Sequence, residues 1–303
     1  MHMKHSTILI FLFSCCIMAA CRRDDALDDV NDIPGLGGDT WVPGPIDVWI
    51  KDSLTTPLNV AVKYKWDQGE LDFTHTLVPP KEEKIIPVLS TIRQAWLKPY
   101  EAEAGALFLK RYVPKHFVLV GSASYNTDGT ITLGTAEGGR KIVLYVLNDF
   151  RTKAMAGYVP SDSFNVKQMF HTIEHEFGHI LHQNILYPQE FKRISVGMYT
   201  SNWNNVSEAN ARADGFVTAY AMSAPDEDFV EMIATMLVEG KQGFDDLVNG
   251  ITNPGPNGTT PEQAKAKLRQ KEAIVVKYFA EAWKINFYSL QARTRTAIDG
   301  LTR

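Results

Sequence analysis

The sequence predicts an α+β fold, with a mixed-sheet N-terminal subdomain over residues 46–182 and a helical C-terminal subdomain over residues 183–303. Strand-like apolar runs lie before residue 150, whereas most segments after residue 160 carry apolar residues at helical spacing. The chain has 303 residues, of which 45% are hydrophobic. It is therefore long enough to bury one large core or two subdomains.

The first expected elements are a strand and a helix. The period of two typical of a strand is seen in Val60, Val62, Tyr64 and Trp66. A helix is expected to begin at Pro87, because proline has no N–H to leave unpaired in a first turn. It is expected to pass through Val88, Ile92 and Trp96 and to stop before Pro99.

A hairpin and a buried strand are expected next. Residues 117–120 are predicted to form a strand, residues 127–130 a turn, and residues 131–133 the return strand. Residues 141–147 form an almost continuous apolar run, which predicts a strongly buried strand.

A long helix with two contrasting faces is predicted from about residue 162 to His182. Asp162 and Ser163 are its candidate N-caps. Helical spacing is seen in its apolar residues Val166, Phe170, Ile173, Phe177 and Ile180. At about 100° per residue, the nearly opposite side carries His171, His175, His179 and His182. One face is thus expected to pack on a core while the other presents imidazoles.

His175 and His179 enclose the pentapeptide His-Glu-Phe-Gly-His. Because residues four apart lie one helical turn above each other, both rings can reach one metal ion. Glu176 is offset around the helix, where it can hold a metal-bound water without being a ligand. This HExxH spacing is typical of zinc hydrolases, although so short a motif also occurs by chance. Four of the eight histidines lie in this helix, which makes a chance match hard to sustain.

His171 and His182 share the histidine face but need a separate interpretation. His182 is two turns from His175, about 10 Å along the axis, so a straight helix cannot bring both to one zinc ion. Where zinc hydrolases with a longer histidine motif have a glycine and a third histidine, this chain has His182 and Ile185. We expect His171 and His182 to support the ligands or to line the cleft; the alternative is that they are solvated residues.

A third zinc ligand must come from elsewhere, since a catalytic zinc site takes three protein ligands and keeps one position open. Glu227 is the best candidate. It opens a segment with helical spacing of Phe229, Met232, Ile233, Met236 and Leu237. Ser223 with Asp226 has the pattern of a capping box, and Gly240 suits the far end. The alternative is that the acidic residues only favour the helix dipole.

The last part of the chain is expected to be a loop followed by a helix. Residues 249–258 are rich in Asn, Gly and Pro. Thr260 and Gln263 form a capping-box pattern with Pro261 in the first turn. The apolar residues of the predicted helix are Leu268, Val275, Tyr278 and Ala282.

Residues 227–231 resemble the E-x-F-x-E element of gluzincin metallopeptidases such as anthrax lethal factor. The resemblance implies that Glu227 binds zinc and that Glu231 supports a ligand histidine. Residues 215–221 are similar to a segment that carries a catalytic tyrosine shortly before the ligand glutamate, which implies that role for Tyr220.

Over roughly residues 45–295, the chain resembles a family of bacterial lipoproteins described as zinc metallopeptidases associated with nutrient import. The segments that carry this resemblance are Lys65-Trp66-Asp67, Pro79-Pro80, Trp96, Pro99-Tyr100, residues 134–139 and Lys277-Tyr278-Phe279. It implies a zincin-like fold, one Zn²⁺ per chain, a peptide or protein substrate and an outer-membrane nutrient importer as partner.

These residues together predict a zinc metallopeptidase. Zinc lowers the pKa of its bound water towards about 7 and polarises the substrate carbonyl. Glu176 is expected to take the proton of the water and to deliver it to the leaving amine. Tyr220 is expected to donate a hydrogen bond to the oxyanion, unless it is an interface or core residue.

Two other classes of zinc protein stay open. One is a catalytically weak zinc-containing surface binding protein accessory to a nutrient importer. Glu176 argues against it, because a binder needs no base. The other is a structural zinc site, which would normally use a fourth protein ligand, often a cysteine. The only cysteines are Cys15, Cys16 and Cys21, so none is available in the folded part for zinc or for disulfides.

The N-terminus has the pattern of a lipoprotein signal peptide over residues 1–20. Lys4 precedes an apolar run from Ile8 to Ala20 that is short for a bilayer span. Residues 18–21 resemble a lipobox in which Cys21 is lipidated, although Met18 stands where leucine is usual; an ordinary secretory signal is the alternative. The acidic, glycine-containing residues 21–45 are expected to be a solvated tether.

The expected location is therefore the bacterial cell envelope, with a lipid anchor in the outer membrane and possible exposure at the cell surface. A net charge of −4 and the lack of a basic stripe argue against a nucleic-acid partner.

Overall fold

The computed structural model describes residues 42–71, 74–125, 131–132, 134–137 and 141–303. Gly44–Arg303 forms one compact unit. The predicted signal peptide, Cys21 and nearly all of the tether lie outside the described residues. The division between subdomains after residue 182 stays a prediction. In the part of the chain that is described, no helix is both long enough and apolar enough to cross a membrane.

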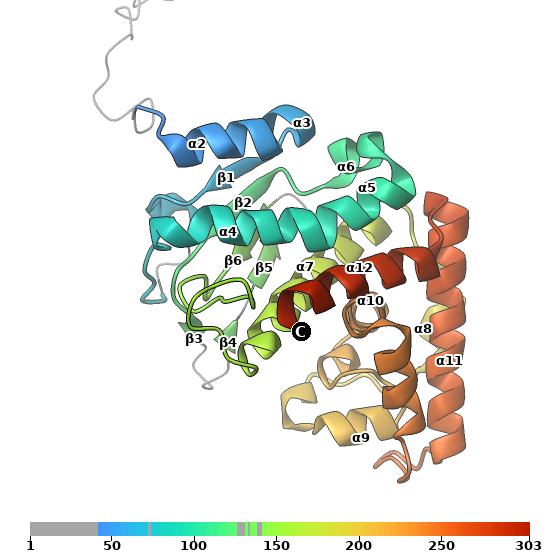
Figure 1. The fold of residues 1–303 in the computed structure, drawn as a ribbon. Coiled ribbons are helices and arrows are strands. Elements are labelled where there is room, and N and C mark those ends of the chain that lie inside the picture. Colours follow the sequence, from blue (N-terminus) through green and yellow to red (C-terminus); the bar gives the residue numbers. More distant parts are fainter. Residues whose placement is uncertain (1–41, 72–73, 126–130, 133, 138–140) are drawn as a thin grey trace, which may run out of the picture. The chain divides into compact units, whose positions relative to one another are not determined.

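Helices make up most of the unit, around a small sheet (Figure 1). The α-helices are α2 (Pro45–Ile50), α3 (Thr56–Leu58), α4 (Glu82–Ile92), α5 (Lys98–Ala104), α6 (Ala106–Tyr112), α7 (Asp162–Asn184), α8 (Glu190–Ile194), α9 (Glu208–Ala213), α10 (Pro225–Asn249), α11 (Pro261–Tyr278) and α12 (Phe287–Thr302). The short 3₁₀ or π turns are η1 (Lys51–Thr55), η2 (Gln68–Glu70), η3 (Arg93–Leu97), η4 (Trp203–Asn205), η5 (Tyr220–Met222) and η6 (Phe279–Trp283). The strands are β1 (Ala61–Lys63), β2 (His116–Leu119), β3 (Ser124–Tyr125), β4 (Ile131–Thr132), β5 (Gly134–Glu137) and β6 (Lys141–Leu144).

A four-stranded mixed sheet has the strand order β1-β2-β6-β5. The strands β1, β2 and β6 are parallel, and β5 pairs antiparallel with β6 at one edge. Buried strands were correctly predicted in both places: β2 is shifted by one residue from the predicted 117–120, and β6 ends at Leu144 instead of residue 147. The mixed sheet within a mainly helical chain confirms the predicted α+β class.

Both faces of the central strands are buried. Because side chains alternate along a strand, each strand contributes to two clusters. The main core takes Phe117, Leu119, Ile142 and Leu144. A smaller cluster takes Leu77, Val118, Val120 and Val143. Burial on both faces explains why the sequence of β6 is almost continuously apolar.

Helix α7 contacts β5, β6 and η3, and also the C-terminal helices α10 and α12 (Figure 1). Its predicted apolar stripe is buried, which confirms the amphipathic interpretation. Phe177 packs edge-on against Trp96 and Tyr100, with ring centroids 5.2 and 5.0 Å apart. This packing fixes the rotation of α7, so that its histidine face is directed towards α10.

The helix expected between Pro87 and Pro99 extends beyond both prolines, so its predicted ends are wrong. Helix α4 begins at Glu82 and contains Pro87, at a local cost of about 3 kcal/mol. Burial of several apolar side chains, each worth about 1.5–3 kcal/mol, outweighs this cost. Beyond α4, the N–H of Lys98 bonds to the carbonyl of Arg93 in the π turn η3. This wider turn makes room for the ring of Pro99 in α5.

The start of α7 also differs from the prediction. Ser161 occupies the N-cap position, and neither Asp162 nor Ser163 caps the helix. The carboxylate of Asp162 instead accepts hydrogen bonds from Arg151 Nε (3.0 Å) and from the Val159 N–H (2.9 Å). Asp162 thus ties the preceding loop to the first turn of the helix.

Helix α10 begins after Ala224, with Pro225 in its first position, so the capping box predicted for Ser223 is wrong. Gly240 has a φ of 70° and interrupts the helical backbone, after which a second helical segment runs to Asn249. The capping box of Thr260 is confirmed.

The predicted return strand pairs with a different partner. Ile131–Thr132 lies antiparallel to Ser124–Tyr125 and not beside residues 117–120, whose neighbours in the sheet are parallel strands. The predicted turn at 127–130 and Leu133 lie outside the described residues. The strand predicted over residues 60–66 is limited to Ala61–Lys63.

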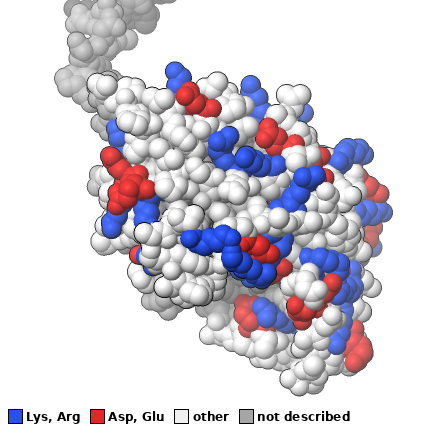
Figure 2. Space-filling view, viewed as in Figure 1, with Lys and Arg blue, Asp and Glu red and all other residues white. Residues whose placement is uncertain are grey.

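Basic and acidic side chains are interspersed on the face shown in Figure 2. Ion pairs among the described residues include Arg293 Nε with Glu103 Oε1 at 2.6 Å, which joins α12 to α5.

Candidate metal centre

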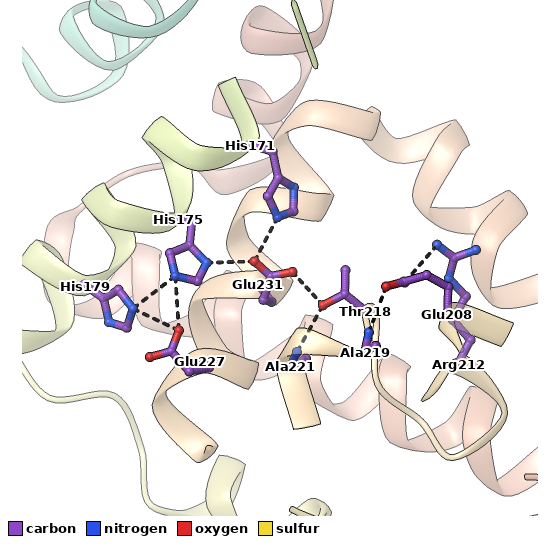
Figure 3. A network of polar contacts seen from close by, with 10 residues as sticks. All are labelled: His171, His175, His179, Glu208, Arg212, Thr218, Ala219, Ala221, Glu227 and Glu231. Carbon is purple, nitrogen blue, oxygen red and sulfur yellow. Dashed lines mark hydrogen bonds and ion pairs between the residues drawn. The ribbon is translucent and has the colours of Figure 1, made fainter. Parts of the chain in front are cut away.

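The candidate centre lies where α7 and α10 meet. Helix α7 carries His175 and His179 on its face towards α10, and Glu227 lies in the first turn of α10 (Figure 3). Gly178 permits the close approach of the two helices. A Cβ at this position would lie only 3.0 Å from Val230 Cγ1 and 3.1 Å from Val230 Cβ.

Three side-chain atoms converge at this junction. His175 Nε2 and His179 Nε2 are 3.2 Å apart, and Glu227 Oε2 lies 3.1 Å from the former and 3.3 Å from the latter. A tetrahedral zinc ion with bonds of about 2.0–2.1 Å places its ligands about 3.3–3.4 Å from one another. The two imidazoles and the carboxylate therefore fit a zinc ion in both chemistry and spacing.

Glu231 lies one turn along α10 and is nearly fully buried. Its Oε1 is 2.7 Å from His175 Nδ1 and 2.8 Å from His171 Nε2. A carboxylate that accepts a hydrogen bond from Nδ1 orients the ring of His175 and leaves its Nε2 available to bind a metal ion. Burial alone would raise the pKa of Glu231, but the charges and hydrogen bonds of His171 and His175 hold that pKa well below its usual range.

The two carboxylates create an environment that favours positive charge at His175. Burial alone would lower the pKa of His175, yet hydrogen bonds to Glu227 and Glu231 raise it to about 10. Burial would likewise raise the pKa of Glu227, but hydrogen bonds from His175 and His179 hold that pKa well below its usual range. The negative charge of Glu227 and Glu231 would also stabilise a bound cation at this place.

His182 supports the other candidate ligand. Its Nε2 lies 3.0 Å from His179 Nδ1. Burial, followed by the neighbouring His179, lowers the pKa of His182, so the neutral ring can accept the Nδ1 proton of His179. The ring of His182 packs edge-on against Tyr187 and Phe229. Both extra histidines of α7 thus contact the candidate site, rather than extending freely into solvent.

Glu176 and Tyr220 lie beside the candidate ligands. A carboxylate oxygen of Glu176 is within 4.8 Å of ring nitrogens of His175 and His179. The Tyr220 ring is tilted over that of His175, with centroids 5.7 Å apart. Burial, followed by the charge of Glu227 and a hydrogen bond to it, raises the pKa of Tyr220. The phenol therefore stays protonated and able to donate a hydrogen bond at neutral pH.

The structure also brings in residues that the sequence interpretation missed. Thr218 Oγ1 donates to Glu231 Oε2 at 2.6 Å, and Glu208 Oε1 accepts from the Ala219 N–H at 3.1 Å (Figure 3). The ring of Trp203 packs edge-on against Tyr220, with centroids 4.8 Å apart. No short motif contains these residues, although Thr218 falls within residues 215–221, the segment that was predicted to carry a catalytic tyrosine.

An HExxH helix that faces a glutamate on a second helix, within an α+β fold, defines a zinc metallopeptidase of zincin-like fold. The chain belongs to the family described as "Putative zinc-binding metallo-peptidase", whose model matches residues 39–288.

A solved structure from Bacteroides caccae ATCC 43185, described as a "putative zinc-binding metallo-peptidase", is similar to this chain. The two are 32% identical, with a TM-score of 0.67, and the similarity covers 84% of this chain and 93% of the other. A search of curated proteins found no match.

Proposed function

We propose that this protein is a zinc-dependent peptidase of gluzincin type, with one zinc ion held by His175, His179 and Glu227. The observation that carries the proposal is the convergence of two Nε2 atoms and one carboxylate oxygen within 3.1–3.3 Å of one another. The neighbouring Glu176 supports hydrolysis rather than simple binding, because a binding site needs no base.

The chain provides a proton acceptor and a hydrogen-bond donor for this reaction. Zinc held at the site would polarise the carbonyl of a peptide bond and acidify a water molecule. Glu176 takes the proton of the attacking water and passes it to the leaving amine. Tyr220, whose raised pKa keeps its hydroxyl protonated, donates a hydrogen bond to the oxyanion that develops on the carbonyl.

The surrounding residues hold the two imidazoles in the required orientation. Glu231 fixes His175 through Nδ1, and His171 shares the same carboxylate oxygen. His182 fixes His179 through its Nδ1. Partners of this kind increase the basicity of the ligands and the affinity for the metal ion.

The decisive experiment is zinc-dependent cleavage of a peptide library by the wild type and by Glu176→Gln. Glutamine has nearly the same volume but cannot accept the proton, so the variant should keep zinc and lose hydrolysis. Glu190→Gln, at an exposed glutamate of α8, is the control and should cleave normally. A Glu176→Gln protein that binds zinc and still cleaves would exclude Glu176 as the base. A wild type that binds peptides without cleaving them would favour the binding-protein alternative.

We also propose that the protein is attached to the bacterial envelope through a lipid on Cys21, on the outer membrane and exposed at the cell surface. The apolar run before Cys21 and the lipobox-like residues 18–21 support this location. The resemblance to lipoproteins associated with nutrient import supports an outer-membrane importer as partner. In that arrangement, the peptidase would shorten peptide or protein substrates next to the importer.

A further inference from the structure

We infer that Thr218 is a positioning residue, whose hydroxyl sets the place of Tyr220 relative to the metal centre by linking the Tyr220 turn to Glu231. This inference rests on the proposed peptidase function. It concerns how the chain aligns its candidate oxyanion donor.

The hydroxyl of Thr218 joins two parts of the site. It donates to Glu231 Oε2 at 2.6 Å and accepts the N–H of Ala221 at 3.1 Å. Ala221 is the residue after Tyr220, so the second bond acts on the turn that carries the phenol. One side-chain oxygen thus connects the backbone of the Tyr220 turn to the carboxylate that orients His175.

The side chain of Glu231 is held in place by contacts outside that turn. The carboxylate is nearly fully buried, and its other oxygen is held by His171 and His175 at 2.8 and 2.7 Å. If Thr218 moved, it would therefore either lose its hydrogen bond to Glu231 or shift Glu231 and, with it, His171 and His175. Other contacts also hold this segment, including a hydrogen bond from the Thr200 N–H to the carbonyl of Met222. Glu208 accepts from the Ala219 N–H, and Trp203 packs on the Tyr220 ring.

Tyr220 needs such positioning because it is 38% exposed and lies at the edge of the core. Its contacts include the rings of His175 and Trp203 and a hydrogen bond to Glu227. An oxyanion donor is effective only when its atom lies about 2.7–3.1 Å from the developing charge. Trp203 and His175 limit the ring on two sides, and Thr218 fixes the backbone from which the ring extends.

The test compares Thr218→Val with Thr218→Ser. Valine keeps the shape of threonine but removes both hydrogen bonds, whereas serine keeps the hydroxyl. Thr235→Val is the matched control, because Thr235 is buried in α10 and its hydroxyl has no partner among the described residues. Zinc content, kcat and KM are measured at saturating zinc for these variants, for Tyr220→Phe, and for Thr218→Val combined with Tyr220→Phe.

Thr218→Val should lower kcat about 10–100-fold, the range for loss of a supporting hydrogen bond, with a much smaller change in KM. Thr218→Ser and Thr235→Val should stay close to the wild type. The double variant should be no slower than Tyr220→Phe alone, because a residue that acts through Tyr220 has nothing to position once the phenol hydroxyl is gone. In zinc-free protein, Thr218→Val should also speed hydrogen exchange of the peptide that contains the Ala221 amide.

The inference is overturned if Thr218→Val keeps wild-type kcat, if Thr218→Ser is equally impaired, or if Tyr220→Phe itself has no effect. It is also overturned if Thr218→Val slows the Tyr220→Phe enzyme as much as it slows the wild type. These outcomes differ from failure of the proposed function, in which the wild type shows no zinc-dependent cleavage or Glu176→Gln stays active.

Discussion

Glu176 and Glu227 are both glutamates beside the same two histidines, yet their positions suit different tasks. Glu227 approaches from α10 and presents one oxygen to the Nε2 atoms of His175 and His179. Its depressed pKa keeps it ionised, as a metal ligand must be. Glu176 follows His175 in the chain and is turned about 100° from it around α7, so its carboxylate can face a water molecule instead.

At the residue scale, we expect Glu227→Ala to weaken zinc binding at least about 100-fold. Loss of a residue that only supports a ligand costs about 10–100-fold, and loss of the ligand itself should cost more. Zinc affinity is measured by competition with a chelator of known affinity.

Asp226→Ala is the suitable control for this experiment. Asp226 is half exposed and bonds to Tyr187 and Lys192 and not to a proposed zinc ligand, so its loss should change zinc affinity much less than loss of Glu227. Asp228→Ala is unsuitable, because Asp228 is fully buried and paired with Lys271 at 2.6 Å. Equal zinc affinity in Glu227→Ala and Asp226→Ala would contradict the assignment of Glu227 as a ligand.

At the element scale, the centre depends on two helix contacts that hold α10 in place. The first is the close approach of α7 at Gly178. The second is the buried pair of Asp228 and Lys271, whose Nζ also donates to the carbonyl of Gly215. This pair ties the first turn of α10, which carries Glu227, to α11 and to the segment before Tyr220. Leaving one of these charges unpaired would be costly, about 3–5 kcal/mol.

We expect Gly178→Ala to destabilise the protein by about 1 kcal/mol and to weaken zinc binding. Alanine gains about 1 kcal/mol in helix propensity, but its methyl group would be forced against Val230, and such overpacking costs about 1–3 kcal/mol. The two helices must then separate, which moves Glu227 away from the histidines. Urea unfolding of the zinc-free protein gives the change in free energy of unfolding.

Gly300→Ala is the matched control in α12. A Cβ there would meet no heavy atom within 4 Å, so only the helix propensity changes. The free energy of unfolding of the variant should therefore rise by up to about 1 kcal/mol. If Gly178→Ala raises the free energy of unfolding as much as Gly300→Ala does, the contact between α7 and α10 is not tight.

At the scale of the whole molecule, the residues that the structure brings together at the candidate centre follow from local sequence patterns more directly than the fold around them. The spacing of His175 and His179 and the apolar stripe of α7 depend only on helix geometry, which sequence periodicity reports directly. The extension of α4 past Pro99 could not be predicted, because it needs a π turn that buried neighbours stabilise. The bonds of Glu231 to Thr218 and of Asp228 to Lys271 join separate elements, and no local signal marks them.

The proposed anchor is tested with the full chain. Cys21→Ser should move the processed protein from the membrane to the soluble fraction, because the lipid on this cysteine is the proposed attachment. Cys15→Ser and Cys16→Ser, inside the predicted signal peptide, should stay in the membrane fraction and serve as controls. A Cys21→Ser protein that stays in the membrane pellet would show that the attachment has another cause.

Zinc should also stabilise the whole unit, because its proposed ligands come from α7 and α10, which pack against each other and against α12. An ion that binds only the folded state raises the free energy of unfolding by about 2.7 kcal/mol when its free concentration is 100 times Kd. Removal of zinc with a chelator should therefore lower the free energy of unfolding and Tm of the wild type, and re-addition should restore both.

The zinc-dependent change in stability also distinguishes a metal ligand from a catalytic base. Glu176→Gln should respond to zinc as the wild type does, since Glu176 is placed to act on water and not to bind the ion. Glu227→Ala should lose most of the zinc-dependent stabilisation at the same zinc concentration, because one of the three proposed ligands is gone. If Glu227→Ala keeps the full stabilisation while Glu176→Gln loses it, the roles proposed for the two glutamates are reversed.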